Sequence, residues 1–293
     1  MPEWFAIATF ESAGRTGTGL VLGDQLYVAP LAGDANALIA QWVEAQASLA
    51  ALADQMSRGP QKPLEKGSYK LLAPYRPGRI FGAASNYYEH AREMGTKLAE
   101  RKESAPYVFM KAETSVIGPG DTVRIPAQSQ KVDWEVELAA VIGRGGRNIA
   151  AADALSHVAA YTVINDISAR DLNRRGDYPF THDWFRGKSW DTFAPLGPWL
   201  VPAACIADPQ NLRLRLDVNG ETMQNDTTAG MIFSLAEQIV YLSGILTLRP
   251  GDLIATGTPE GTGMGRGIFL KPGDTMTASI EKIGSLTNPV EMA

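Results

Sequence analysis

The sequence predicts an α+β fold that is mainly β, with a small N-terminal β/α domain ahead of a larger domain. Short apolar runs separated by turns fill the chain from Arg79 onward, which is typical of a fold rich in strands. The tripeptide Pro-Gly-Asp precedes such a run three times, at residues 119–121, 250–252 and 272–274, and Pro followed by Gly suits the centre of a type II turn. With 293 residues, 45% of them hydrophobic, the chain is long enough to bury a large core.

The first 57 residues have the pattern of three strands followed by a helix. Three apolar runs between residues 5 and 28 are separated by glycine-containing turns, which predicts a small β-meander. Apolar residues then recur at helical spacing over residues 34–56, and Asp34 is placed to cap the start of that helix. We therefore expect an N-terminal domain at residues 1–57.

The segment 58–78 contains four prolines and few apolar residues, and we interpret it as a linker. The remaining residues, 79–293, are expected to form the main domain. Helices are expected there at 86–94, 151–158 and 231–242. The rest of this domain has the pattern of strands and turns.

Charge and cysteine content exclude several classes of protein. The chain carries 27 Lys and Arg against 32 Asp and Glu, with no basic block to neutralise phosphates, so nucleic acid is not an expected partner. Cys205 stands alone, which excludes an internal disulfide and a cysteine-rich metal site. The first ten residues include Glu3 and lack a basic stretch, so we expect neither a secretion signal nor a membrane association. We expect a cytoplasmic protein.

Three carboxylates alternate with apolar residues between residues 131 and 142. If this segment is a strand, its period of two places Asp133, Glu135 and Glu137 together on one face. Ala139 follows on the same face, so this face also becomes buried, and buried like charges need a cation. A solvated edge strand with unpaired acids is the alternative.

Asp166 follows an apolar run that ends at Asn165, where an acid is most often a turn residue or a helix cap. Together with Glu135 and Glu137 it makes an all-oxygen set without cysteine or a nearby histidine. Such a set prefers Mg²⁺, Mn²⁺ or Ca²⁺ to Zn²⁺. From these residues alone, a metal site and an ordinary acidic surface both stay open.

His90 and Glu93 lie three residues apart in a short predicted helix, so they share a face. A carboxylate there can orient the imidazole and stabilise its charged form, as a general base requires. An ordinary surface pair is the alternative, and it stays open. Asn86 and Glu89 have the spacing of a capping box, which predicts the start of the helix.

Two further segments could bind a charged ligand. Lys188 lies in a Gly-flanked, aromatic-rich stretch and could stabilise negative charge from a buried position, although a solvated lysine is the usual case. Residues 256–263, Thr-Gly-Thr-Pro-Glu-Gly-Thr-Gly, could offer backbone N–H groups and hydroxyls to an anion. The P-loop order and a complete dinucleotide fingerprint are both missing, so ATP and NAD are not expected.

Seven motifs, in order between residue 79 and about residue 290, resemble those of the fumarylacetoacetate hydrolase family. They are Asn86-Tyr-Tyr-Glu-His-Ala-Arg-Glu-Met-Gly95, Pro106-Tyr-Val-Phe-Met-Lys111, Asp133-Trp-Glu-Val-Glu-Leu138, Asn165-Asp-Ile-Ser-Ala-Arg-Asp171, Lys188-Ser-Trp-Asp191, Val218-Asn-Gly-Glu-Thr-Met-Gln224 and Pro250-Gly-Asp-Leu-Ile-Ala-Thr-Gly-Thr-Pro259. The resemblance implies a mixed β-sandwich roll, usually a homodimer, that acts on a small-molecule 2-oxo acid. It also implies that Mg²⁺ or Mn²⁺ is held by Glu135, Glu137 and Asp166.

The same resemblance implies roles for further residues. His90 and Glu93 would form a water-activating dyad on a mobile lid, and Lys188 would support the developing negative charge. Substrate contacts would come from four residues, Lys111, Arg170, Gln224 and Thr258. The stretch 176–186 has the character of an insertion, and substrate choice could be encoded there.

These expectations favour a hydrolase that cleaves a C–C bond in a 2,4-dioxo acid of the acylpyruvate or fumarylpyruvate type, as in aromatic catabolism. His90 would take a proton from the attacking water. A decarboxylase or a tautomerase/isomerase of an oxaloacetate-like acid is the alternative, with the same metal and no water attack. A metal-dependent binding protein without catalysis is disfavoured, because a binder would not need His90, Glu93 and Lys188 together.

Overall fold

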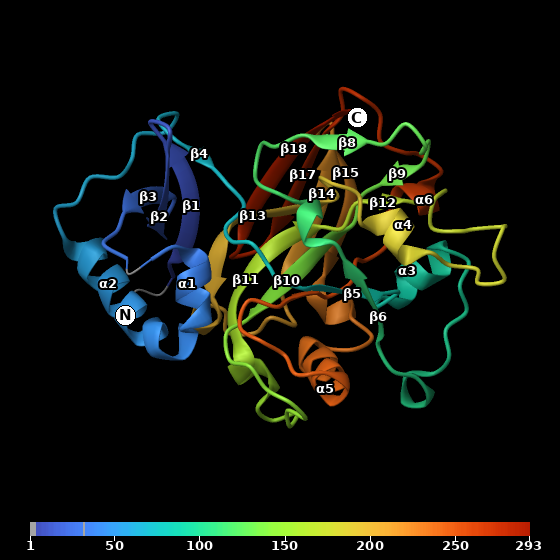
Figure 1. Cartoon of the computed structure of the whole chain (residues 1–293), viewed down its shortest axis with the longest axis horizontal. Coiled ribbons are helices and arrows are strands. Elements are labelled where there is room, and N and C mark those ends of the chain that lie inside the picture. Colours follow the sequence, from blue (N-terminus) through green and yellow to red (C-terminus); the bar gives the residue numbers. More distant parts are fainter. Residues whose placement is uncertain (1–3, 32) are drawn as a thin grey trace.

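The computed structural model describes residues 4–31 and 33–293, and Figure 1 shows a small N-terminal unit beside a larger body. Residues 1–3 and 32 lie outside this description, and with them Glu3, on which the expected lack of a secretion signal partly rests. Among the described residues, no helix combines the length and the apolar character that crossing a bilayer requires. Strands outweigh helices along the chain, as the sequence predicts.

The N-terminal unit has the predicted meander followed by helical structure. Its elements are β1 (Ala6–Ser12), β2 (Arg15–Leu22), β3 (Gln25–Val28), α1 (Ala35–Ala40) and α2 (Trp42–Arg58). Asp34 caps α1 as expected, because its side chain accepts the N–H of Ala37 at 2.8 Å. The expected single helix is divided in two at Gln41, whose φ of -118° and ψ of 31° lie outside the helical region.

The segment 58–78, predicted as a linker, contains a strand that joins the N-terminal unit. β4 (Lys70–Leu71) pairs with β1, and β1 pairs antiparallel with β13 (Ala194–Pro202) of the main body. The strand order β3-β2-β1-β13-β11-β10-β16-β5-β6 therefore runs through both parts of the molecule. Main-chain pairing joins the first 57 residues to the rest.

The centre of this long sheet is covered on both faces. Its other strands are β5 (Ile80–Ala84), β6 (Tyr107–Lys111), β10 (Val136–Ile142), β11 (Val158–Asn165) and β16 (Leu253–Ala255), with β7 (Val116–Ile117) beside β13. Every residue of β10 and β11 is buried, as expected for strands without a solvated face. On one face, Ala139 and Val141 share a buried cluster with Trp42 and Leu49 of α2.

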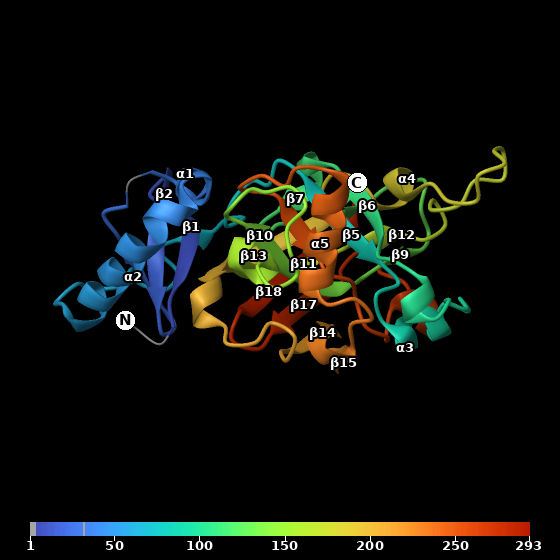
Figure 2. The same cartoon turned by 90° about the horizontal axis from the view of Figure 1, so that it is seen from below.

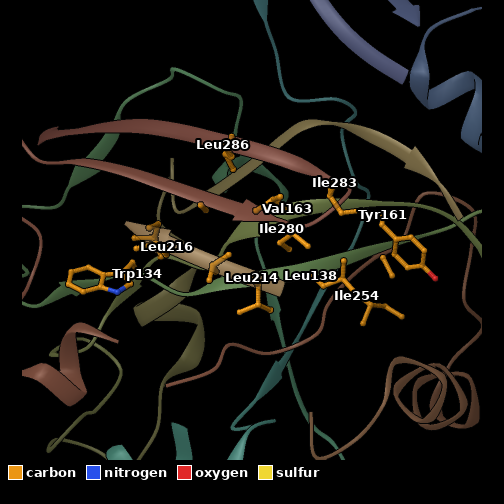
Figure 3. Close-up of a cluster of buried hydrophobic side chains, with 14 of the residues drawn as sticks. Trp134, Leu138, Tyr161, Val163, Leu214, Leu216, Ile254, Ile280, Ile283 and Leu286 are labelled. Atoms are coloured by element: carbon orange, nitrogen blue, oxygen red, sulfur yellow. The ribbon is translucent and has the colours of Figure 1, made fainter. Parts of the chain in front are cut away.

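The second sheet packs on the other face of β10 and β11. Its order is β15-β14-β17-β18-β8, with β8 (Val123–Ile125), β14 (Arg213–Val218), β15 (Glu221–Thr227), β17 (Thr275–Ile280) and β18 (Gly284–Met292). Figure 3 shows Leu214, Leu216 and Leu286 of this sheet in one cluster with Leu138 and Val163 of the first. The two sheets form the expected mixed β roll.

The three Pro-Gly-Asp turns lie where strands begin. Their glycines, Gly120, Gly251 and Gly273, have φ values of 76°, 88° and 93°, which a type II turn requires at its third position. β8, β16 and β17 begin within two residues of the respective turns. The predicted strand entries are confirmed.

Helices are few in the main body. They are α3 (Tyr88–Glu93), α4 (Trp184–Lys188), α5 (Leu235–Ile245) and α6 (Gly263–Arg266), with 3₁₀ turns at Arg101–Glu103, Glu113–Ser115, Ala154–His157, Ala203–Cys205 and Thr228–Gly230, and with β9 (Val132–Asp133) paired to β12 (Ser168–Ala169). The helix expected at 151–158 is thus a single 3₁₀ turn. In both views α3 and α4 lie at the end of the body away from the N-terminal unit (Figures 1 and 2).

The capping box expected at Asn86 is wrong. The amide of Asn86 donates to the carbonyl of Phe233 at 2.9 Å and accepts the N–H of Phe233 at 2.8 Å. Tyr87 precedes α3 without a side-chain cap. Asn86 therefore joins the start of α3 to the segment before α5, a contact that local spacing does not predict.

Candidate active site

Glu135, Glu137 and Asp166 come together at the ends of two neighbouring strands. β10 and β11 pair antiparallel with Val136 opposite Asn165, so the acids that flank Val136 lie beside the acid that follows Asn165. Each carboxylate offers one oxygen, and these atoms lie within 4.8 Å of one another, all on buried side chains. The three residues predicted as metal ligands form one cluster.

Asp133 is not part of this cluster, contrary to the expectation of one shared acidic face. The strand is interrupted at residues 134–135, between β9 and β10, so the alternation of faces is lost there. Asp133 instead accepts the N–H groups of Gly263 at 2.6 Å and of Met264 at 2.9 Å. It anchors the first two residues of α6.

Three cationic side chains are buried against these acids. Lys188 Nζ lies 2.8 Å from Glu135 Oε2 and 2.6 Å from Asp166 Oδ2. Lys111 Nζ lies 2.5 Å from Asp166 Oδ1. Arg170 Nη2 lies 2.5 Å from Glu135 Oε1. The predicted charge stabiliser and two of the predicted substrate contacts therefore all touch the acid cluster.

Burial and neighbouring charges shift the pKa values of the cluster in opposite directions. Burial raises the pKa of the Glu137 carboxyl well above its usual range, and the charges of Asp166 and Glu135 raise it further. Burial also opposes ionisation of Glu135, but Lys188 and Arg170 outweigh it and lower the pKa of that carboxyl. Glu137 is thus the carboxyl least compensated by the side chains around it.

A set of three buried carboxylates suits a divalent cation such as Mg²⁺ or Mn²⁺, which prefers oxygen ligands. Like charges buried together are otherwise costly, and a bound cation would compensate Glu137. The residues present therefore fit the ion expected from the sequence. Glu135, Glu137 and Asp166 would hold it.

Adding Mg²⁺ or Mn²⁺ is expected to raise the melting temperature of the metal-free protein, because an ion that binds only the folded state stabilises it by mass action. At a hundredfold excess over Kd the gain is about 2.7 kcal/mol, a shift of several degrees. Glu137→Gln should weaken this response, whereas the exposed Glu221→Gln is a control that should keep it. Scanning calorimetry measures both. A wild-type response in Glu137→Gln would contradict the site.

His90 and Glu93 form the predicted pair on α3. His90 Nδ1 lies 2.8 Å from Glu93 Oε1, and the His90 side chain is buried. Glu93 also accepts the N–H of Gly261 at 2.9 Å. The pair is therefore an oriented imidazole–carboxylate unit, and the alternative of an ordinary surface pair is wrong.

One loop joins the imidazole–carboxylate pair to the acid cluster. The N–H of Gly257 donates to Glu137 Oε2 at 2.7 Å, and the N–H of Gly261 in the same loop donates to Glu93 Oε2 at 2.9 Å. The candidate base and the candidate metal ligands thus belong to one site, between α3 and the ends of β10 and β11.

Gln224 and Thr258, two predicted substrate contacts, bind each other and the main chain. Gln224 Nε2 donates to Thr258 Oγ1 at 2.8 Å, and Gln224 Oε1 accepts the N–H of Val136 at 3.0 Å. Thr258 Oγ1 donates to the carbonyl of Val136 at 2.9 Å. These bonds tie the first residue of β10 to the loop after β16. A contact with substrate stays a prediction for both residues.

The segment 176–186, which the sequence suggests is an insertion, reaches the site through Trp184, a residue without an individual role in the sequence-based prediction. The Trp184 ring stacks on Phe109 with centroids 5.3 Å apart and on His182 with centroids 5.7 Å apart. Lys188 Nζ lies over the Phe109 ring, 5.0 Å from its centroid. The cluster of aromatic residues is visible in the sequence, but their partner lies on β6, far away in the chain.

Comparison with known proteins decides the family. Residues 79–291 match the family described as fumarylacetoacetate (FAA) hydrolase, C-terminal. The chain belongs to the fumarylacetoacetate hydrolase family. It is 43% identical over 230 residues to the mitochondrial oxaloacetate tautomerase fahd2 of Xenopus laevis, which covers 78% of this chain and 70% of that protein.

Solved structures of the fumarylacetoacetate hydrolase family share the whole fold. A fumarylacetoacetate hydrolase from Exiguobacterium antarcticum superposes with a TM-score of 0.84 at 32% identity, over 99% of this chain and 100% of that chain. A maleylpyruvate hydrolase from Sphingobium has a TM-score of 0.79 at 28% identity, over 98% and 100% of the two chains. The family is one of enzymes, and the proteins similar to this chain include both a tautomerase and hydrolases.

The expectation of a cytoplasmic location is contradicted. The Xenopus laevis relative is named as mitochondrial, and so are relatives from Bos taurus and Homo sapiens. Location is set by targeting signals that are read separately from the fold. Net charge and a single cysteine therefore do not determine it.

Proposed function

We propose that the chain is a divalent-cation-dependent isomerase that interconverts the keto and enol forms of oxaloacetate or of a closely related 2-oxo dicarboxylic acid. The similarity to an oxaloacetate tautomerase supports this assignment, and it favours the alternative of the sequence analysis over C–C hydrolysis. The structural observation that carries the proposal is the buried His90–Glu93 pair beside Glu135, Glu137 and Asp166. Tautomerisation is a proton transfer, and this pair is suited to it.

In the keto-to-enol direction, the C3–H bond breaks and its electron pair forms the C2–C3 double bond, while the 2-oxo oxygen gains a proton from solvent. His90, oriented by Glu93, would accept the C3 proton. The buried ammonium of Lys188 would stabilise negative charge as it develops. A cation held by the three carboxylates supplies Lewis-acid stabilisation of the 2-oxo oxygen when bound.

Deuterium exchange at C3 of oxaloacetate tests this proposal. With Mg²⁺ in D₂O, proton NMR should show the C3 signal disappearing faster with protein than with Mg²⁺ alone. If pyruvate accumulates and the protein does not accelerate exchange at C3, the chain is a decarboxylase instead. An exchange rate equal to that of Mg²⁺ alone would contradict the tautomerase.

Hydrolysis of a 2,4-dioxo acid is the second candidate, supported by the structural similarity to a maleylpyruvate hydrolase. The same His90 would then take a proton from water as the water attacks the distal carbonyl. A panel of acylpyruvates, assayed for released pyruvate with Mg²⁺, separates the two reactions. Cleavage of an acylpyruvate without C3 exchange on oxaloacetate would favour the hydrolase.

The loop between α3 and β6 is expected to close over a bound ligand. Its residues from 95 to 105 are mostly exposed, and the ion pair of Arg101 with Glu237 ties it to α5. Amide hydrogen exchange in this loop should slow severalfold when oxalate and Mg²⁺ are added, because closure removes openings of a weakly packed segment. Peptides of α2 are the control and should not change. If hydrogen exchange in the loop is unchanged, the loop does not act as a lid.

A further inference from the structure

The carboxylate of Glu93 is held by a loop as well as by His90. Glu93 Oε2 accepts the N–H of Gly261 at 2.9 Å, and Glu93 Oε1 accepts the hydroxyl of Thr262 at 2.8 Å. Oε1 is the same oxygen that lies 2.8 Å from His90 Nδ1. One carboxylate oxygen therefore joins the imidazole to the threonine hydroxyl.

The loop that carries Thr262 is fixed on both sides. Gly261 has a φ of +94°, and a Cβ on this residue would lie 2.1 Å from the carbonyl oxygen of Met223, so the backbone is packed closely there. On the other side, Asp133 accepts the N–H of Gly263 at 2.6 Å. The position of the Thr262 hydroxyl is thus set by the loop.

The bonds to Glu93 favour its charged form. Burial opposes ionisation, but the bonds from His90, Gly261 and Thr262 outweigh it and lower the pKa of the Glu93 carboxyl. A charged carboxylate at Nδ1 keeps the proton of the neutral imidazole on that nitrogen, which leaves Nε2 as the proton acceptor. The direction of the acceptor lone pair then depends on where the carboxylate points.

We propose that Thr262 is a positioning residue for the His90–Glu93 pair. Its hydroxyl fixes the rotamer of the Glu93 carboxylate, and through it both the tautomer and the direction of the imidazole. This inference rests on the proposed function, in which His90 is the base. Without the hydroxyl, Oε1 keeps only the imidazole at 2.8 Å and the long bond from the Thr262 N–H at 3.4 Å, and a base that is loosely oriented reacts more slowly.

Two substitutions of Thr262 test the proposal by kinetics. Thr262→Val removes the hydroxyl and keeps the shape of the side chain, so kcat for oxaloacetate tautomerisation should fall ~10-fold with KM within about twofold. Thr262→Ser keeps the hydroxyl and should recover most of the rate. Thr287→Val is a matched control, because it removes a surface hydroxyl bonded to Thr277, and its rate should equal that of wild type. An unaffected Thr262→Val, or an equally slow Thr262→Ser, would overturn the proposal.

A measurement without turnover separates this inference from the proposed function. Nitrogen-15 NMR of the histidine side chains reports which ring nitrogen carries the proton, and we expect neutral His90 to carry it on Nδ1. Thr262→Val should shift His90 toward a mixture of tautomers. If the wild-type protein does not act on oxaloacetate, but Thr262→Val still changes the tautomer of His90, the proposed function is overturned and the positioning role stands.

Gly265→Ala reaches the same carboxylate and keeps both the Thr262 hydroxyl and the Gly265 N–H that donates to it at 3.4 Å. It therefore also covers the case in which Thr262→Val does not fold. A Cβ at residue 265 would lie 2.3 Å from Glu93 Oε2, so the carboxylate must move. The same change in the His90 tautomer is expected. A wild-type NMR signature in Gly265→Ala and in Thr262→Val would overturn the positioning role.

Discussion

Replacing His90 with alanine is expected to lower kcat for oxaloacetate tautomerisation by ~10²-fold or more, since general base catalysis contributes roughly 10²- to 10⁴-fold. Without the imidazole, the oriented base that would take the C3 proton is missing. Glu93→Ala should be milder, because Glu93 orients the base and stabilises its charge. The double variant should be little slower than His90→Ala, because residues that act as one unit are not additive.

Two controls make the His90 result specific. His90→Ala keeps all three carboxylates, so its melting temperature should respond to Mg²⁺ like that of wild type. Thr287→Val removes a surface hydroxyl bonded to Thr277 and should leave the rate at that of wild type. If His90→Ala folds, binds metal and keeps its rate, the pair is not the base, and the bound cation drives the reaction without it.

Asp166→Ala is expected to destabilise the protein by about 3–5 kcal/mol, the usual effect of leaving buried charges without their partner. Both oxygens of Asp166 are paired with ammonium groups, one from Lys111 and one from Lys188. Both lysines are buried almost completely, so water cannot replace the missing carboxylate. Urea unfolding of the metal-free protein measures the loss.

A second substitution shows whether the lost charge pairing is the cause. Lys111→Met in the Asp166→Ala background removes one of the uncompensated ammonium groups, so it should restore part of the stability. Asp24→Ala removes an exposed partner of Lys66 and should hardly change the urea midpoint. A loss in Asp166→Ala no greater than in Asp24→Ala would contradict this account.

The metal-ligand cluster could be predicted because its signals are local. The period of two within β10 predicts that Glu137 shares a face with Ala139, and both are buried as expected. Asp166 follows the last residue of β11, and antiparallel pairing brings the two segments together. His90 and Glu93 were predictable for the same reason, since three residues along a helix fix their relative position.

The features that the sequence did not reveal depend on contacts between distant segments. Asn86 binds Phe233, far along the chain, and this bond replaces the capping box that local spacing suggests. Asp133 does not share a face with Glu135 and Glu137, because the strand is interrupted after Asp133. The N–H groups that bind its carboxylate lie at the start of α6. The partner of Thr262 could not be recognised for the same reason, because the carboxylate it binds is on α3. Spacing rules describe residues that are close in the sequence, so they do not predict contacts between distant segments.

A form of the protein that lacks residues 1–78 would leave β13 without β1 on its outer side. Ile7 lies opposite Leu200 in that pairing, and the helices of the N-terminal unit cover apolar residues of the same sheet. An unprotected strand edge recruits strands from other chains, which leads to aggregation. The N-terminal unit therefore protects the edge of the sheet that carries the site residues. We expect the shortened form to aggregate even where its site residues are intact.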